Sequence, residues 1–203
     1  MCLYAVTDSM WLQGRTLPEV VEEALKGGAT FMQIREKELP YNEFMQLARK
    51  VKAVTDRYHV PYVIDDEVEI AKEIDADGVH IGQSDKDLIE ARKILGQDKI
   101  IGVSVGTVEQ AVEAEKSGAD YLGVGSIFTT STKLDAQAVS LNTLHEICKA
   151  VSIPVVAIGG ITVDNMLQLK GIGVDGVAVV SAIFAAENIK RSTQILLELA
   201  REL

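Results

Sequence analysis

The chain has 203 residues, of which 47% are hydrophobic, 25% charged and 5% aromatic, and its formal net charge is −10. This length and balance are typical of one α/β domain and exclude a disordered chain. The acidic charge disfavours nucleic acid and anionic membranes as partners, because neither would be attracted over long range. If an anion binds here, the positive charge that holds it must therefore be local. We expect one domain, residues 1–203.

The first residues contain no basic region followed by an apolar stretch, and no apolar run approaches the roughly 20 residues of a membrane helix. We therefore expect a cytoplasmic protein. Cys2 and Cys148 lie far apart and form no Cys-x-x-Cys motif, so we interpret both as structural thiols.

Short apolar runs alternate with longer segments of helical periodicity along the chain. The predicted strands are Leu3–Thr7, Phe31–Arg35, Tyr62–Asp65, Gly78–Ile81, Ile100–Ser104, Tyr121–Val124, Val155–Ile158 and Gly176–Val179. The predicted helices are Leu17–Lys26, Tyr41–Tyr58, Glu67–Ile74, Asp85–Leu95, Val108–Ser117, Leu141–Ala150, Asp164–Lys170 and Ser192–Leu203.

The joints from helix to strand resemble one another. Gly28, Gly118 and Gly173 each stand a few residues before a predicted strand, where a helix commonly ends on a glycine with positive φ. Such joints, with strands that are apolar on both faces, indicate a parallel sheet covered by helices. Eight βα units favour a (β/α)8 TIM barrel. A doubly wound open sheet is the less favoured alternative, because it carries fewer strands and the first strand is not followed by G-x-G-x-x-G.

In a TIM barrel the active site lies at the C-terminal ends of the strands. The residues there are Thr7, Asp8, Gln33, Arg35, Lys37, Asp65, Asp66, Glu67, His80, Gln83, Asp85, Ser104, Gly125, Thr130, Ser131, Thr132, Lys133, Gly159, Gly160, Val180 and Ser181. None of the three histidines is expected to act as a general base, and His80 lies in a strand without an obvious partner.

Gly159 and Gly160 follow the seventh strand, and Val180 and Ser181 follow the eighth. Loops at these two places commonly present backbone N–H groups to a phosphate, so we predict a phosphate site here, the alternative being an ordinary strand-to-helix turn. The polar connection from Thr130 to Lys133 is unusually long, which also favours an anionic ligand.

Gln33 and Arg35 share one face of the second strand, and Lys37 stands just beyond it. Inward-pointing cations need an anionic partner, although a solvated surface run is the alternative. Asp66 and Asp85 follow neighbouring strands, so their carboxylates could share Mg²⁺. Helix N-capping explains the same two residues equally well.

Four segments together resemble the signature segments of the thiamine phosphate synthase family, in order and at similar spacing. They are Gln33-Ile34-Arg35-Glu36-Lys37, Asp77-Gly78-Val79-His80-Ile81-Gly82-Gln83, Gly123-Val124-Gly125 leading to Thr130-Ser131-Thr132-Lys133, and Ala157-Ile158-Gly159-Gly160-Ile161. The resemblance spans nearly the whole chain.

The resemblance implies a transferase that couples 4-amino-2-methyl-5-(diphosphooxymethyl)pyrimidine to thiazole phosphate and releases pyrophosphate by a dissociative route. It implies that the pyrimidine diphosphate binds to Gln33, Ile34, Arg35, Glu36, Lys37, Ser104 and Lys133, among which Arg35, Lys37, Ser104 and Lys133 are the catalytic candidates, and it places Asp65 among the substrate-binding positions. It implies that the thiazole phosphate binds to Thr130, Thr132, Gly160, Val180 and Ser181, with Ser131 a further substrate-binding residue, and that Asp66 and Asp85 bind Mg²⁺. Both partners are small molecules, and a homo-oligomer is left open.

Among the residues that depart from the family pattern, Asp65 and Gly106 bear on the chemistry. Asp65 stands where the family usually has Asn, and a carboxylate near a diphosphate adds repulsion, so we expect Asp65 either to tilt toward Mg²⁺ or to face away from the site. Gly106 lies where a His is frequent in relatives, including thiazole tautomerases. A thiazole tautomerase, a non-catalytic sensor of phosphorylated ligands, and a sugar-phosphate isomerase or aldolase are the rival interpretations.

Overall fold

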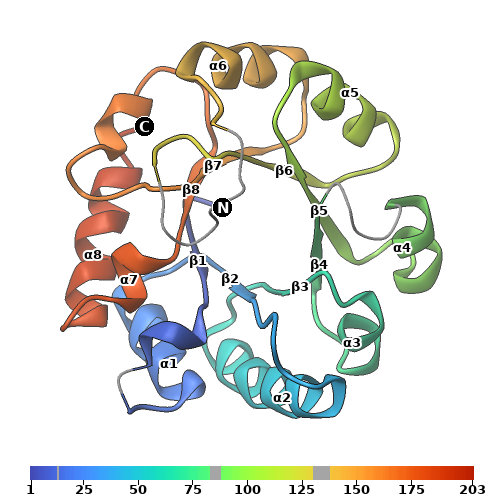
Figure 1. The fold of residues 1–203 in the computed structure, drawn as a ribbon, viewed down its shortest axis with the longest axis vertical. Coiled ribbons are helices and arrows are strands. Elements are labelled where there is room, and N and C mark those ends of the chain that lie inside the picture. Colours follow the sequence, from blue (N-terminus) through green and yellow to red (C-terminus); the bar gives the residue numbers. More distant parts are fainter. Residues whose placement is uncertain (13, 83–87, 130–137) are drawn as a thin grey trace.

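The computed structural model describes residues 1–12, 14–82, 88–129 and 138–203. Its strands form one closed, parallel barrel in chain order (Figure 1). They are β1 (Leu3–Val6), β2 (Phe31–Ile34), β3 (Tyr62–Asp65), β4 (Gly78–Ile81), β5 (Ile100–Val105), β6 (Tyr121–Val124), β7 (Val155–Ile158) and β8 (Gly176–Val179). The barrel closes where β1 pairs with β8, with Leu3 beside Val177. The predicted (β/α)8 barrel is therefore confirmed.

Helices surround the barrel on the outside (Figure 1). Among the described residues they are α1 (Leu17–Gly27), α2 (Tyr41–Tyr58), α3 (Val68–Glu73), α4 (Leu88–Leu95), α5 (Val108–Lys116), α6 (Leu141–Ala150), α7 (Ser181–Phe184) and α8 (Ile189–Ala200), with the 3-10 helices η1 (Ser9–Trp11) and η2 (Met166–Leu169). Helix α1 illustrates the local causes. The Glu19 carboxylate accepts a hydrogen bond from the Thr16 N–H at 2.7 Å at its start, and Gly28 ends it with φ of 101°.

Three parts of the chain differ from the predicted helices. The segment expected to form a helix from Asp164 to Lys170 contains only η2, because the Asn165 side chain accepts from the Thr162 N–H and donates to the Gly160 carbonyl, both at 2.8 Å. Such local bonds compete with helix formation. The last helix begins earlier than predicted, where Asn188 caps it. The short helix α7 was not expected.

Side chains alternate along the strands between the barrel interior and the layer under the helices. The interior set includes Tyr4, Phe31 and Tyr121, whose rings contact one another edge to face with centroids 4.7–6.0 Å apart. Gly102 faces the same interior, and a Cβ there would lie 2.1 Å from Cζ of Tyr121. A glycine on β5 therefore makes room for the Tyr121 ring.

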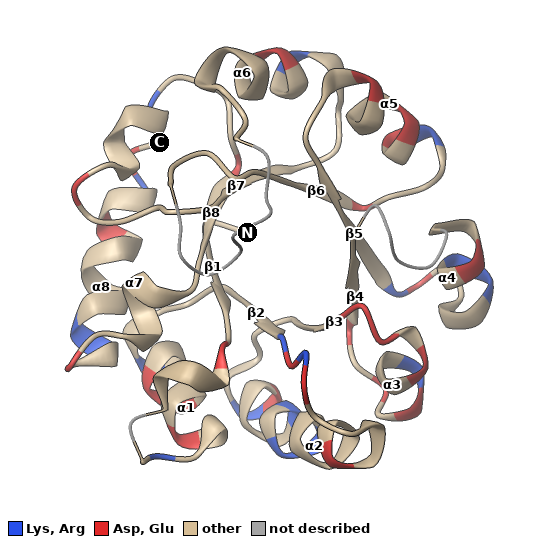
Figure 2. Cartoon of the chain, in the orientation of Figure 1, with Lys and Arg blue, Asp and Glu red and all other residues tan. Residues whose placement is uncertain are grey.

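Charged residues lie mainly on the outer helices and on the segments that follow β2 and β3 (Figure 2). In the part of the chain that the structure describes, no helix has the length and apolar character that a membrane span requires. The charges on the segments after β2 and β3 lie at one end of the barrel, the end at which these strands finish.

Candidate active site

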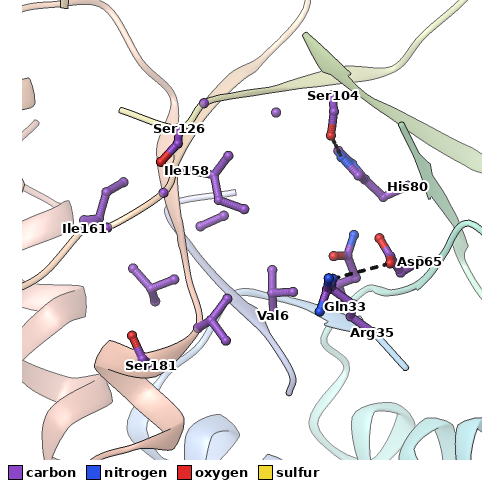
Figure 3. A pocket seen from close by; sticks show the side chains of 17 residues that line it. Val6, Gln33, Arg35, Asp65, His80, Ser104, Ser126, Ile158, Ile161 and Ser181 are labelled. Carbon is purple, nitrogen blue, oxygen red and sulfur yellow. Dashed lines mark hydrogen bonds and ion pairs between the residues drawn. The ribbon is translucent and has the colours of Figure 1, made fainter. Parts of the chain in front are cut away.

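A pocket opens at the C-terminal ends of the strands (Figure 3). Its volume is about 170 Å³. One water molecule needs on the order of 10–15 Å³ on the same measure, so a small organic molecule has room here. The lining comprises Val6, Gln33, Arg35, Asp65, His80, Ser104, Gly123, Gly125, Ser126, Ile158, Gly159, Gly160, Ile161, Ala178, Val179, Val180 and Ser181. Residues from all eight strands or from the segments directly after them contribute to it.

Two cations and two carboxylates gather where β2 and β3 end. Lys37 forms ion pairs with Asp65, at 3.0 Å, and with Asp66, and Arg35 lies 3.8 Å from Asp65. Burial disfavours the charged form of Lys37, but the carboxylates of Asp66 and Asp65 outweigh it and raise the pKa of the ammonium group. Lys37 is therefore held fully charged beside the pocket.

Asp65 lines the pocket, so of the two orientations expected for it, facing away from the site is wrong, and tilting toward Mg²⁺ stays a prediction. Its side chain is 11% exposed, and its partners are the cations Lys37 and Arg35. The repulsion expected between Asp65 and an anionic ligand is thus partly balanced by the two cations just beyond β2.

The Asp66 side chain does not cap a helix. Helix α3 begins at Val68 after Glu67, and no side-chain hydrogen bond caps it. Asp66 adopts a left-handed φ of 62°, with its N–H donating to the His80 carbonyl at 2.9 Å, and its carboxylate contacts Lys37. Among the described residues, no three His, Cys, Asp or Glu side chains form a metal-binding group. Asp66 offers one hard oxygen ligand of the kind that Mg²⁺ prefers.

The opposite side of the pocket is built from the segments after β7 and β8. Gly159 and Gly160 both have positive φ, of 103° and 63°. A Cβ on Gly159 would lie 2.2 Å from the Ser126 hydroxyl oxygen, and one on Gly160 would lie 2.4 Å from the Thr129 carbonyl oxygen. Only glycine fits this close approach of two loops. Val180 and Ser181, at the start of α7, line the pocket beside them.

Three residues of the segment after Gln33 are placed differently from one another. Ile34 is fully buried in the layer under the helices, so its side chain points away from the pocket. Glu36 is half-buried and accepts a hydrogen bond from Ser9; burial raises the pKa of its carboxyl, and the Ser9 hydroxyl partly opposes that change. The side chains of Ile34 and Glu36 do not line the pocket. Lys37 contacts the pocket indirectly, because it forms an ion pair with Asp65, which lines it.

His80, for which the sequence shows no obvious partner, has hydrogen-bond partners on both ring nitrogens. The structure places its Nδ1 2.8 Å from the Tyr121 hydroxyl and its Nε2 2.9 Å from the Ser104 hydroxyl. Strand alternation could have found this arrangement, because His80 pairs with Gly102 and Ser104 lies two residues further on the same face. Gly123 on β6 leaves room for the imidazole, since a Cβ there would lie 3.0 Å from Cε1.

The remaining predicted site residues are Gln83, Asp85, Thr130, Ser131, Thr132 and Lys133, which lie outside the described residues. The structure thus brings seven of the predicted substrate-binding residues together around one pocket: Gln33, Arg35, Asp65, Ser104, Gly160, Val180 and Ser181.

Comparison with known proteins gives the family. The family model described as thiamine monophosphate synthase matches residues 3–183. The chain belongs to this family. It is 54% identical over 197 residues to the thiamine-phosphate synthase of Ruminiclostridium cellulolyticum, covering 97% of this chain and 94% of that protein. It is 50% identical over 200 residues to the thiamine-phosphate synthase of Clostridium acetobutylicum, covering 98% and 95%.

The thiamine phosphate synthase relationship extends to solved structures. The structure of thiamine phosphate pyrophosphorylase from Pyrococcus furiosus matches with a TM-score of 0.91 and 42% sequence identity, and the match covers 98% of this chain and 95% of that one. The resemblance inferred from the motifs is therefore confirmed. The chain is an enzyme, a transferase of the thiamine-phosphate synthase class that acts on small molecules.

Proposed function

We propose that this thiamine-phosphate synthase couples 4-amino-2-methyl-5-(diphosphooxymethyl)pyrimidine to thiazole phosphate, with release of pyrophosphate. The observation that supports this choice of substrates is that two different sides of one pocket are suited to bind anions. Arg35 with the neighbouring Lys37 stands on one side, and Gly160 with Ser181 stands on the other. A diphosphate and a monophosphate would bind at these two sides, with the reacting atoms between them.

The chemistry fits a site that has cations beside it. In the dissociative route, the bond from the pyrimidine methylene carbon to the diphosphate oxygen breaks first, and the electron pair leaves with pyrophosphate. The thiazole nitrogen then donates its lone pair to the methylene carbon and forms the new C–N bond. This nitrogen has no proton to lose, so no general base is required. The rate depends instead on stabilising the departing charge, which Arg35 and Lys37 would do.

Mg²⁺ is part of the proposal because Asp66 presents a carboxylate of the right chemistry at the end of β3. Asp66 would hold the ion together with Asp85, which lies outside the described residues. When bound, the ion would supply further positive charge for the departing pyrophosphate. The side chains that the structure describes would bind the two substrates, and the remaining loop residues Thr130 to Lys133 are proposed to complete the site.

The test is an assay of the purified protein with both precursors, in the presence of Mg²⁺ or EDTA. We expect thiamine phosphate to form only with Mg²⁺, and Arg35→Ala to lower kcat/KM for the pyrimidine diphosphate by at least tenfold. Arg57→Ala is the matched control, because Arg57 lies on α2 and its side chain is 62% exposed. Absence of metal-dependent product would refute the proposed reaction.

The rival functions predict other results in the same assay. A non-catalytic sensor would bind a phosphorylated precursor without turnover, and a thiazole tautomerase would change the thiazole phosphate in the absence of the pyrimidine. The relatives named above are synthases, and Gly106 occupies the place where tautomerases frequently have a histidine. Both points favour coupling of two substrates.

A further inference from the structure

Five polar side chains form a continuous chain of hydrogen bonds across the barrel interior. Gln33 Nε2 donates to the Tyr4 hydroxyl at 2.9 Å, and the Tyr4 and Tyr121 hydroxyls are 2.9 Å apart. The Tyr121 hydroxyl contacts His80 Nδ1 at 2.8 Å, and His80 Nε2 contacts the Ser104 hydroxyl at 2.9 Å. This hydrogen-bond chain therefore starts at Gln33 and ends at Ser104, and both residues line the pocket (Figure 3).

The middle of this chain is closed to water. Tyr4 is 2% exposed and Tyr121 fully buried. Burial raises the pKa of the Tyr4 phenol, with a further contribution from Tyr121, and burial likewise raises the pKa of the Tyr121 phenol. Both side chains are neutral at physiological pH, so each hydroxyl has a single proton to donate.

The Gln33 amide determines the direction in which these protons point. The Tyr4 oxygen accepts from Gln33 Nε2, and in the described residues the only other polar partner of its hydroxyl is Tyr121. If Tyr121 donated to Tyr4, the buried Tyr4 proton would have no acceptor, which costs roughly 1–3 kcal/mol. Tyr4 must therefore donate to Tyr121. By the same reasoning Tyr121 donates to His80 Nδ1, because its oxygen already accepts from Tyr4.

We propose that Tyr4, Tyr121 and His80 are positioning residues that transmit the orientation of the Gln33 amide to Ser104. With Nδ1 acting as acceptor, neutral His80 carries its proton on Nε2 and donates it to the Ser104 oxygen. The Ser104 proton then points away from His80. At the other end, one N–H of Gln33 Nε2 donates to Tyr4, and this orientation of the amide fixes the position of its oxygen as an acceptor for a ligand. The chain thus fixes one acceptor and one donor on the pocket wall.

This inference deepens the proposed function by naming what the fixed pair would recognise. An aminopyrimidine presents an amino donor next to a ring-nitrogen acceptor, which complements an amide oxygen and a hydroxyl proton. A heterocycle with an oxo group and a protonated ring nitrogen presents the reverse pattern and would leave buried polar groups unpaired. The hydrogen-bond chain would therefore act in selection of the pyrimidine.

Nuclear magnetic resonance of the ¹⁵N-histidine-labelled protein without substrate tests the direction of the chain. The signals of His80 are assigned with His59→Gln and His145→Gln, which remove the other two histidines. We expect the proton of His80 on Nε2 in the wild-type protein at slightly alkaline pH. A wild-type His80 protonated on Nδ1 would overturn the proposal, because the chain would then run in the opposite direction.

Gln33→Glu provides the sharper test. A carboxylate can only accept, so Tyr4 would donate to Glu at this position, the order of donors would reverse, and His80 would gain a proton on Nδ1. The double variant Gln33→Glu/Tyr4→Phe breaks the chain and should leave Nδ1 unprotonated. If Nδ1 stays unprotonated in Gln33→Glu, or if it is protonated in the double variant as well, the effect does not pass through Tyr4 and the proposal fails.

Tyr121→Phe keeps the proposal testable if Glu at position 33 prevents folding. Loss of the hydroxyl should change the ¹⁵N shift of His80 Nδ1 and raise KM for the pyrimidine diphosphate about fivefold, with KM for thiazole phosphate unchanged. An unchanged Nδ1 shift would overturn the inference. The nuclear magnetic resonance results need no substrate, so they stand even if the proposed reaction fails in the assay described above.

Discussion

Replacement of Asp65 by Asn tests whether the cations at the end of β2 bind a diphosphate. Asp65 lies 3.0 Å from Lys37 and 3.8 Å from Arg35, and these three residues together with Asp66 make a group of net charge zero. Asp65→Asn leaves the side-chain size unchanged and raises that net charge to +1. Lys37 keeps its contact with Asp66, so its position should be maintained.

The magnitude follows from Coulomb's law. For a phosphate charge about 5 Å from the Asp65 carboxylate, removing the repulsion stabilises the complex by roughly 3 kcal/mol at an effective dielectric constant near 20, and by about 0.8 kcal/mol in water. We expect KM for the pyrimidine diphosphate to fall about fivefold to tenfold, with kcat equal to or above that of the wild type. The gain should shrink at high salt.

Steady-state kinetics with each precursor varied in turn measure this change. Asp56→Asn is the matched control, because it removes the same charge from an exposed position on α2, where its only ion-pair partner among the described residues is Lys52. An unchanged or higher KM would refute the role of this charge group in diphosphate binding. A large loss of kcat would show that the Asp65 carboxylate acts on the metal or on the reacting atoms.

Two further predictions concern stability. Gly102→Ala places a Cβ 2.1 Å from Cζ of Tyr121, so it should destabilise the barrel by about 1–3 kcal/mol in thermal unfolding. Gly106→Ala is the control and should change stability little, because the nearest atom to its Cβ would be 3.7 Å away. Equal effects of the two substitutions would contradict the packing argument. Because burial raises the pKa of the Glu36 carboxyl above its ordinary 4.5, the folded protein binds more protons than the unfolded chain just above that pH. Urea unfolding at a series of pH values should therefore show that the free energy of unfolding of the wild type falls relative to that of Glu36→Gln as the pH rises through this window. If the two proteins show the same dependence on pH, the Glu36 carboxyl does not have a raised pKa in the folded state.

The fold could be predicted from the sequence because the apolar runs, the helical periodicity and the glycines at helix ends all indicate the same series of βα units. All eight predicted strands overlap the observed ones, and Gly28, Gly118 and Gly173 have the positive φ expected of them. In the segment from Asp164 to Lys170, where no α-helix forms, a side chain is responsible: the Asn165 amide bonds to neighbouring backbone and limits the segment to a 3-10 turn. Periodicity does not reveal such a bond.

The site was only partly predictable for a similar reason. Position at or near the C-terminal end of a strand was enough to predict that Gln33, Arg35 and Ser104 meet at one pocket. Position alone does not show that Asp65 pairs with Lys37, or that His80 joins Tyr121 to Ser104, because these contacts also depend on which side chains neighbouring strands place on the same face and on how those side chains rotate. The register between neighbouring strands shows which side chains share a face of the barrel, and the sequence of a single strand does not show this.

The most direct test of the account is the stoichiometry of the complete reaction. Purified protein is mixed with the pyrimidine diphosphate, thiazole phosphate and Mg²⁺, and phosphorus nuclear magnetic resonance follows both products. We predict that thiamine phosphate and pyrophosphate form in equal amounts, and that neither forms when EDTA replaces Mg²⁺. Release of inorganic phosphate in place of pyrophosphate, or binding of both precursors with no product at all, would contradict it.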